Sequence, residues 1–125
     1  MGELFENKVS KTMLMTLQAK ALEGSQKNRL FIDQKAEEIM KQVPTMVNVS
    51  FFDRIGVCLR TRYFDDCCNN FIKSHEHPVI IQLGCGLDDR QGRIGAEDIP
   101  FFSVDFLDVI TLRQEFFEET ATSQM

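Results

Sequence analysis

The sequence lacks an excess of basic residues and any long apolar run. It has 14 Lys and Arg against 19 Asp and Glu, so its net charge is −5, which argues against nucleic-acid phosphates as the main ligand. No apolar run approaches the roughly 20 residues that a membrane-spanning helix requires. The first six residues lack the basic and apolar regions of a signal peptide. We therefore expect a cytoplasmic protein that binds neither nucleic acid nor a membrane.

The sequence also lacks a Cys-x-x-Cys pair, which is a common element of structural metal sites. Its four cysteines are Cys58, Cys67, Cys68 and Cys85, and we expect free, partly buried thiols in a reducing compartment. The segment His75-Glu76-His77 could form a weak metal pair, but it is more typical of a polar loop before Pro78. We therefore predict no metal site.

The length, the composition and the spacing of the apolar residues indicate one globular domain. The 125 residues are 43% hydrophobic and include 11 Phe but no Trp, which is enough for a core. Apolar side chains at helical spacing predict a helix at residues 9–23, a second one capped by Asp33, and a third beginning near Ser50 and Asp53. The third helix is expected to bury a stripe of Ile55, Leu59, Tyr63 or Phe64, Cys67 and Phe71. A last helix carries Val109, Leu112 and Phe116, and the polar tail from residue 118 to 125 is expected to fray.

Residues 79–88, Val-Ile-Ile-Gln-Leu-Gly-Cys-Gly-Leu-Asp, carry the strongest functional signal. The apolar run from Val79 to Ile81 predicts a buried strand that leads into Gly84 and Gly86. A second predicted strand ends at Asp105. A strand, a glycine turn, a short connection, and a strand that ends in an acid form the first part of many nucleotide-binding α/β units. The third glycine of the dinucleotide fingerprint is absent, which makes an NAD-type oxidoreductase the weaker interpretation.

Several segments together resemble the leucine carboxyl methyltransferase family, which includes polyketide O-methyltransferases of the tetracenomycin type. They are the helix at 8–23, Phe31-Ile-Asp-Gln-Lys-Ala36, Leu59-Arg-Thr-Arg-Tyr-Phe-Asp-Asp66, the loop at 79–90, and Phe102 to Ile110. The resemblance implies the helical, lid-forming segment at residues 1–77 and, from 78 to 125, the first β-α-β part of a Rossmann-like methyltransferase sheet. It also implies S-adenosylmethionine as the cofactor and a small-molecule, carboxylate-type acceptor.

The resemblance assigns six residues to the cofactor: Lys20, Arg62, Gly84, Gly86, Asp88 and Asp105. The two glycines would line its methionine and ribose side, and Asp105 would hold the ribose hydroxyls. Arg62 would pair with the methionine carboxylate through its planar guanidinium, helped by Lys20, with Arg60 as the competing choice. Each acid has a simpler alternative. Asp88 could only pair with Arg90 or cap the next turn, and Asp105 could be a helix cap. Asp65 and Asp66 are expected on a solvated face.

The number of predicted strands sets a limit on the function. A doubly wound sheet has about six strands, whereas this sequence predicts two, so open edges and uncovered apolar faces are expected. The first hypothesis is the cofactor-binding N-terminal half of an S-adenosylmethionine-dependent O-methyltransferase, completed by a missing C-terminal half. The alternative is an inactive, truncated homologue that acts as a self-associating homodimer or an interaction module. No residue is an obvious catalytic candidate, and activity of the 125-residue chain alone is left open.

Overall fold

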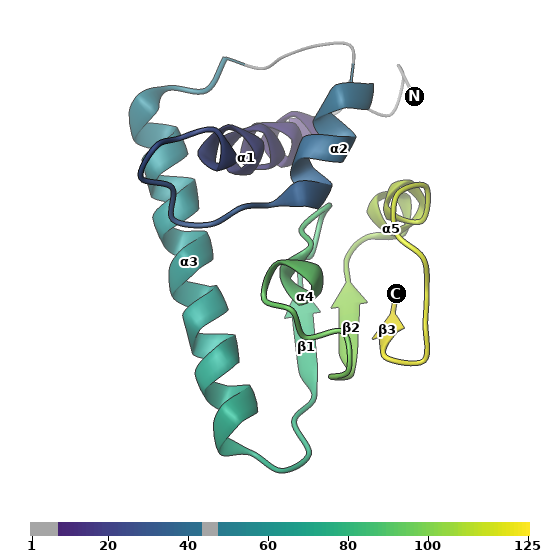
Figure 1. The fold of residues 1–125 in the computed structure, drawn as a ribbon. Helices are drawn as coiled ribbons and strands as arrows, with labels where there is room; N and C mark the ends of the chain where they lie inside the picture. The colour runs from purple at the N-terminus through teal and green to yellow at the C-terminus, as the bar shows by residue number, and fades with distance from the viewer. Residues whose placement is uncertain (1–7, 44–47) are drawn as a thin grey trace. The chain divides into compact units, whose positions relative to one another are not determined.

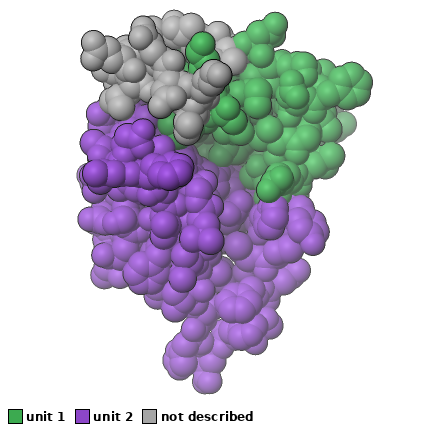
Figure 2. All heavy atoms as spheres, turned by 180° about the vertical axis from the view of Figure 1, so that it is seen from behind, with its two compact units in different colours: residues 1–62 green, residues 63–125 purple. Residues whose placement is uncertain are grey.

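The computed structural model describes residues 8–43 and 48–125 and has helices followed by a small sheet (Figure 1). The helices are α1 (Lys8–Gly24), α2 (Gln34–Gln42), α3 (Phe51–Ser74), α4 (Arg90–Arg93) and α5 (Leu107–Arg113). The strands are β1 (Ile80–Leu83), β2 (Phe101–Val104) and β3 (Ser123–Gln124). The chain divides into two compact units, residues 1–62 and 63–125, which are coloured separately in Figure 2. No helix among the described residues is long and apolar enough to cross a membrane.

The first unit contains α1, α2 and the beginning of α3. Helix α2 begins as expected, because the Asp33 carboxylate accepts a hydrogen bond from the Ala36 amide at 2.9 Å. Ser50 accepts a bond from the Asp53 amide at 3.1 Å before α3, which confirms the predicted capping position. The buried apolar side chains of this unit are Leu14, Leu17, Ala19, Ala36, Ile39, Val43 and Cys58.

A buried ion pair and a thiol contact add polar links within the first unit. Arg54 Nη1 lies 2.9 Å from Glu23 Oε2, and the Glu23 side chain is only 4% exposed. The Cys58 sulfur lies 3.6 Å from the Ala19 carbonyl oxygen. Burial, with the nearby Glu23 carboxylate as a smaller cause, raises the pKa of Cys58 to about 12. Cys58 is therefore a neutral thiol, and the four cysteines are free as expected.

The second unit contains a parallel sheet of order β1-β2-β3. Strands β1 and β2 pair with Ile80 opposite Phe101 and Leu83 opposite Val104. The connection between them is short, as expected, and includes the helix α4. Figure 1 shows the three arrows of the sheet side by side and pointing the same way. The architecture is a mixed helical and parallel-sheet unit, consistent with part of a Rossmann-like methyltransferase fold.

The prediction that β1 is a buried strand is wrong. Val79 and Ile81 are 49% and 62% exposed, whereas Gln82, between Ile81 and Leu83, is buried. Alternate side chains of a strand point to opposite faces of a sheet. One face of β1 is covered within the second unit, and the other carries apolar side chains that nothing in the described residues covers.

Two other expectations also fail. The apolar stripe of α3 is largely exposed, at 54% for Leu59 and 65% for Tyr63, because the residues that α3 buries are Cys58 and Asp65. The tail does not simply fray: β3 pairs with β2 in parallel, and the Phe101 amide donates to the Thr122 carbonyl oxygen at 2.9 Å. An edge strand needs few apolar residues, because its backbone forms the hydrogen bonds to the neighbouring strand. The polar composition of the tail therefore did not predict β3.

Candidate functional site

The loop after β1 requires glycine at two positions. Gly84 and Gly86 have φ angles of +62° and +51°, in the left-handed region that side chains with a Cβ rarely adopt. A Cβ added at Gly84 would meet no atom within 4 Å, so the backbone there is open to a ligand. The Gly84 amide donates to the Val104 carbonyl oxygen at 2.8 Å. The loop therefore stays joined to the end of β2.

Asp105 lies directly after β2 and contacts this loop. Its Oδ2 accepts a hydrogen bond from the Gly86 amide at 2.8 Å, and its Oδ1 accepts one from the Phe106 amide at 2.8 Å. The predicted acid and the predicted glycine turn thus come together at the carboxyl ends of two parallel strands, where open α/β sheets bind their ligands. The alternative interpretation, in which Asp105 only caps the following helix, is wrong, because Phe106 is the N-cap residue of α5.

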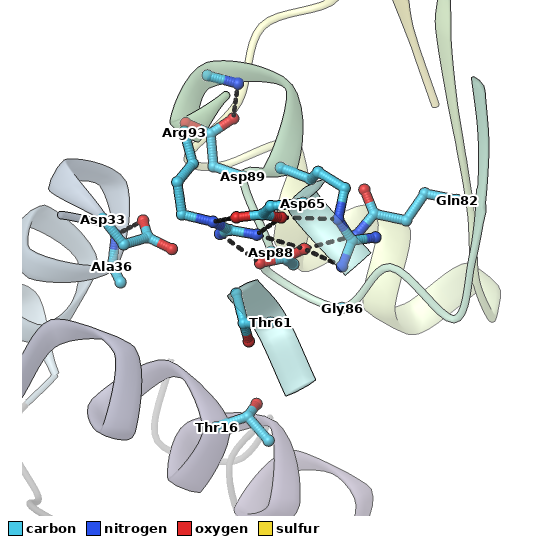
Figure 3. Close-up of polar contacts among 12 residues, drawn as sticks. Thr16, Asp33, Ala36, Thr61, Asp65, Gln82, Gly86, Asp88, Asp89 and Arg93 are labelled. Carbon is cyan, nitrogen blue, oxygen red and sulfur yellow. Dashed lines mark hydrogen bonds and ion pairs between the residues drawn. The ribbon is translucent and has the colours of Figure 1, made fainter. Parts of the chain in front are cut away.

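Asp88 belongs to a network of charged side chains beneath the loop. Arg93 Nη1 lies 2.8 Å from Asp88 Oδ1, and Arg93 Nε lies 2.6 Å from Asp65 Oδ2 (Figure 3). Arg90 Nε donates to Asp65 Oδ1 at 3.0 Å, and Gln82 Nε2 donates to Asp88 Oδ2 at 2.7 Å. We call Asp65, Asp88, Arg90 and Arg93 the charged cluster; it joins α3, the glycine loop and α4.

The charged cluster is largely buried. Buried charges cost free energy unless each has a partner, so the cluster is stable only in a specific arrangement. The side chains of Arg93 and Asp65 are 2% and 6% exposed. Burial by itself would lower the pKa of Arg93, but the hydrogen bonds and attraction from Asp65 and Asp88 raise it above its ordinary value. Removing one partner of a buried pair leaves an uncompensated charge, which costs more than the intact pair contributes. The cluster therefore fixes the position of the loop.

Arg113 supports the loop from α5. Its Nη1 donates to the carbonyl oxygens of Gly86 at 3.0 Å and Asp88 at 2.8 Å, and its guanidinium carbon lies 3.9 Å from the centre of the Phe117 ring. Burial lowers the pKa of Arg113. Within the loop itself, Cys85 is 2% exposed, and burial raises the pKa of its thiol. Cys85 thus fills space under the turn.

The first unit holds the two predicted basic residues. Lys20 lies on α1 and is only 5% exposed. Arg62 lies on α3, and its Nη1 donates to the Leu30 carbonyl oxygen at 2.6 Å. The assignment of both to the methionine carboxylate stays a prediction, as does that of Asp88 to the cofactor. The helix cap proposed for Asp88 belongs instead to Asp89, whose carboxylate accepts from the Gly92 amide.

Sequence reasoning missed the residues that hold the loop in place. Asp65 is buried and paired with two arginines, which corrects its predicted place on a solvated face; Asp66 is exposed as expected. Arg113 gave no local signal, because the carbonyl oxygens that it contacts lie 25 and 27 residues away. Arg93 pairs with Asp88 five residues away, but its bond to Asp65 spans 28 residues and could not be predicted locally. Among the described residues, no three His, Cys, Asp or Glu side chains gather to hold a metal ion.

Comparisons with known proteins agree with this geometry. The model of the leucine carboxyl methyltransferase family matches residues 13–124. The chain belongs to the leucine carboxyl methyltransferase family. It is 33% identical over 115 residues to the tetracenomycin polyketide synthesis O-methyltransferase TcmP of Streptomyces glaucescens, covering 89% of this chain and 43% of that protein.

A second relative is the S-adenosyl-L-methionine-dependent methyltransferase dpfgK of Gibberella zeae. It is 28% identical over 134 residues, covering 96% of this chain and 45% of that protein. The chain therefore spans less than half the length of these curated relatives. No solved structure matches. Family membership favours a methyltransferase over the dinucleotide oxidoreductase, and two relatives named as methyltransferases do not favour the non-catalytic module.

Proposed function

We propose that the second unit is the part of an S-adenosylmethionine-dependent O-methyltransferase that binds the adenosyl group of the cofactor. The hydrogen bond from the Gly86 amide to Asp105 Oδ2 is the observation that carries this proposal. It brings the open glycine turn and the acid together at the ends of β1 and β2. Both relatives are named as methyltransferases, and the name of the Gibberella zeae protein gives S-adenosyl-L-methionine as its cofactor, which supports the proposal.

The residues present fit an adenosine ribose. An ionised carboxylate offers about four lone-pair sites, so Asp105 can accept from two ribose hydroxyls while it keeps its bonds to Gly86 and Phe106. Gly84 leaves its surroundings open to the ligand because no Cβ fills the space. In this proposal Asp105 binds the ribose, and Gly84 and Gly86 line it. Asp88 acts through the loop, since Gln82 and Arg93 hold its carboxylate.

The proposed acceptor is a carboxylate, as the family name suggests. When bound, S-adenosylmethionine supplies an electrophilic methyl group on a sulfonium sulfur. A carboxylate oxygen is already ionised at neutral pH, so the protein has to supply proximity and alignment more than proton transfer. We assign the chain no general base. Lys20 and Arg62 remain candidates for the methionine carboxylate on the resemblance alone.

Calorimetric titration of S-adenosylhomocysteine into the purified 125-residue chain tests the proposal. We expect saturable binding that is lost in Asp105→Ala and weakened in Asp105→Asn, because the amide keeps one acceptor oxygen but loses the charge. Asp108→Ala is the matched control, since Asp108 is an exposed acid in the first turn of α5. Arg62→Ala and Lys20→Ala test the two basic residues separately. A folded chain that binds NAD in preference, or binds neither ligand, would refute the proposal.

A further inference from the structure

Arg113 is a buried charge that the proposed function does not yet use. It is the last residue of α5 and is only 5% exposed. Its Nε is buried and has no hydrogen-bond partner among the described residues. Burying an incompletely bonded charge costs free energy, so an apolar residue would fill this space at a lower cost. The arrangement therefore indicates a role for the guanidinium itself.

The hydrogen bonds of Arg113 go to the glycine loop. Its Nη1 donates to the carbonyl oxygens of Gly86 and Asp88 rather than to a carboxylate. The Asp88 amide in turn donates to the Cys85 carbonyl oxygen at 3.0 Å, which closes a turn around Gly86. The guanidinium also lies over the Phe117 ring, a favourable position for a cation. Arg113 is thus fixed on one side and holds the loop on the other.

The segment from Asp105 to Arg113 holds Gly86 from two directions. Asp105, just before α5, accepts from the Gly86 amide at 2.8 Å, and Arg113, at the end of α5, donates to the Gly86 carbonyl oxygen at 3.0 Å. The helix between them sets the spacing of the two contacts. Gly86 has a φ of +51° and no side chain that could restrict its backbone. Its orientation therefore depends on these two bonds.

We infer that Arg113 is a positioning residue for the ligand, because it keeps the Gly86 amide directed at Asp105. In that arrangement Asp105 presents its remaining lone pairs to the ribose hydroxyls. The inference rests on the proposed function, and it adds a residue outside the loop that sets the affinity. Arg113 touches no ligand and acts through Gly86 and Asp105.

Arg113→Met tests the inference, because Met keeps an apolar stem and removes both hydrogen bonds. Calorimetric titration with S-adenosylhomocysteine should show binding that is weaker by about tenfold. Arg113→Lys keeps the charge and a donor, so it should recover part of the loss. Leu112→Ala is the matched control: Leu112 lies beside Arg113 on α5 and is 2% exposed. It should lower stability and leave the affinity unchanged.

Two further measurements separate positioning from a general loss of stability. In a double-substitution cycle, Arg113→Met should weaken binding less in an Asp105→Asn background than in the parent, because both residues act on one ligand contact. In the ligand-free chain, Arg113→Met should speed amide hydrogen exchange at Gly86 by at least about tenfold relative to Ile80. The Ile80 amide is the internal reference, since it bonds to the Pro100 carbonyl oxygen.

Several results would overturn the inference and leave cofactor binding by the loop standing. Arg113→Met could bind as tightly as the parent, or Leu112→Ala could lose as much affinity. The losses in the cycle could be strictly additive. Exchange at Gly86 and Ile80 could rise equally, which would mean that Arg113 only stabilises the unit. A parent chain that binds no S-adenosylhomocysteine would instead refute the proposed function, and the exchange comparison would still decide whether Arg113 directs the Gly86 amide.

Discussion

The two faces of the β1-β2 sheet have opposite character. The covered face buries Phe101 together with the polar side chains of Gln82 and Ser103. The open face, which consists of Ile81, Leu83, Phe102 and Val104, exposes apolar side chains only. In most soluble proteins the apolar side chains are inside and the polar ones outside. This order is inverted at two neighbouring pairs, where Gln82 is buried beside the exposed Leu83 and Ser103 is buried beside the exposed Val104.

The two faces of the sheet have different roles. The covered face can bury Gln82 because its amide bonds to Asp88, which in turn pairs with Arg93. Buried polar groups are tolerated when they are hydrogen-bonded, and these bonds fix the loop that carries Gly84 and Gly86. The apolar face has no such task within the described residues. We therefore expect substitutions on the covered face to affect stability more than those on the open face.

Loss of Arg93 should produce the largest effect. Arg93→Ala leaves the buried Asp65 and the partly buried Asp88 with Arg90 as their remaining charged partner, so we expect the free energy of unfolding to fall by about 3 kcal/mol, the lower end of the range for a broken buried pair. Urea unfolding followed by circular dichroism measures it. The control is Lys35→Ala, which breaks an exposed pair with Glu38 and should cost at most about 1 kcal/mol. Equal losses in the two variants would mean that the charged cluster does not hold the covered face.

Two adjacent phenylalanines give the most direct test of the two faces. Phe101 is 3% exposed and Phe102 is 42% exposed on the same strand. Phe101→Ala should lower the free energy of unfolding by about 3 kcal/mol, because it removes a buried ring and leaves a cavity. Phe102→Ala should change it by only about 0.5 kcal/mol. The same unfolding measurement compares them, and similar losses for both would contradict an open face in the isolated chain.

The sequence predicted local features well. Asp33 at the start of α2, the glycine turn at Gly84 and Gly86, and the acid at Asp105 were all found, because caps, turns and strand ends depend on residues close together in the chain. The parallel pairing of β1 and β2 agrees with the β-α-β unit that the family resemblance implied. These features define the position of the proposed ligand site.

Long-range features could not be predicted in the same way. The burial of Asp65 depends on Arg90 and Arg93, which lie 25 and 28 residues away. The exposure of Ile81 depends on what covers each face, and an apolar run of three residues cannot distinguish a strand buried on both faces from one buried on a single face. The role of residues 1–77 as a lid, and of Lys20 and Arg62 as ligands, stays a prediction.

A smaller effect on stability is expected at the glycine turn, which directly follows the last residue of β1. Gly84→Ala forces a residue with a Cβ to keep a φ of +62°, and this should cost about 1–2 kcal/mol although the space around it is open. Gly56→Ala in α3 is the matched control, because a Cβ there also meets no atom. That substitution should stabilise the helix by about 0.5–1 kcal/mol. A Gly84→Ala protein as stable as the parent would show that the turn relaxes.

The smallest effect concerns the reactivity of Cys85 under the loop. Burial raises the pKa of its thiol above the ordinary value of 9.0, so a smaller fraction is thiolate at about pH 8 than in an exposed cysteine. We expect iodoacetamide to label the exposed Cys67 first in the folded chain, as peptide mass spectrometry can follow.

The same shift has a consequence for stability. The folded state holds the Cys85 proton more tightly than the unfolded state does, so this contribution is complete below pH 9 and is lost as the pH rises above it. Cys85→Ala should therefore unfold with a weaker dependence on alkaline pH than the parent chain. Arg93→Ala, which loosens the covered face, should speed the labelling of Cys85 and leave that of Cys67 unchanged. Equal labelling of the two cysteines in the folded parent would mean that the covered face does not shield the loop.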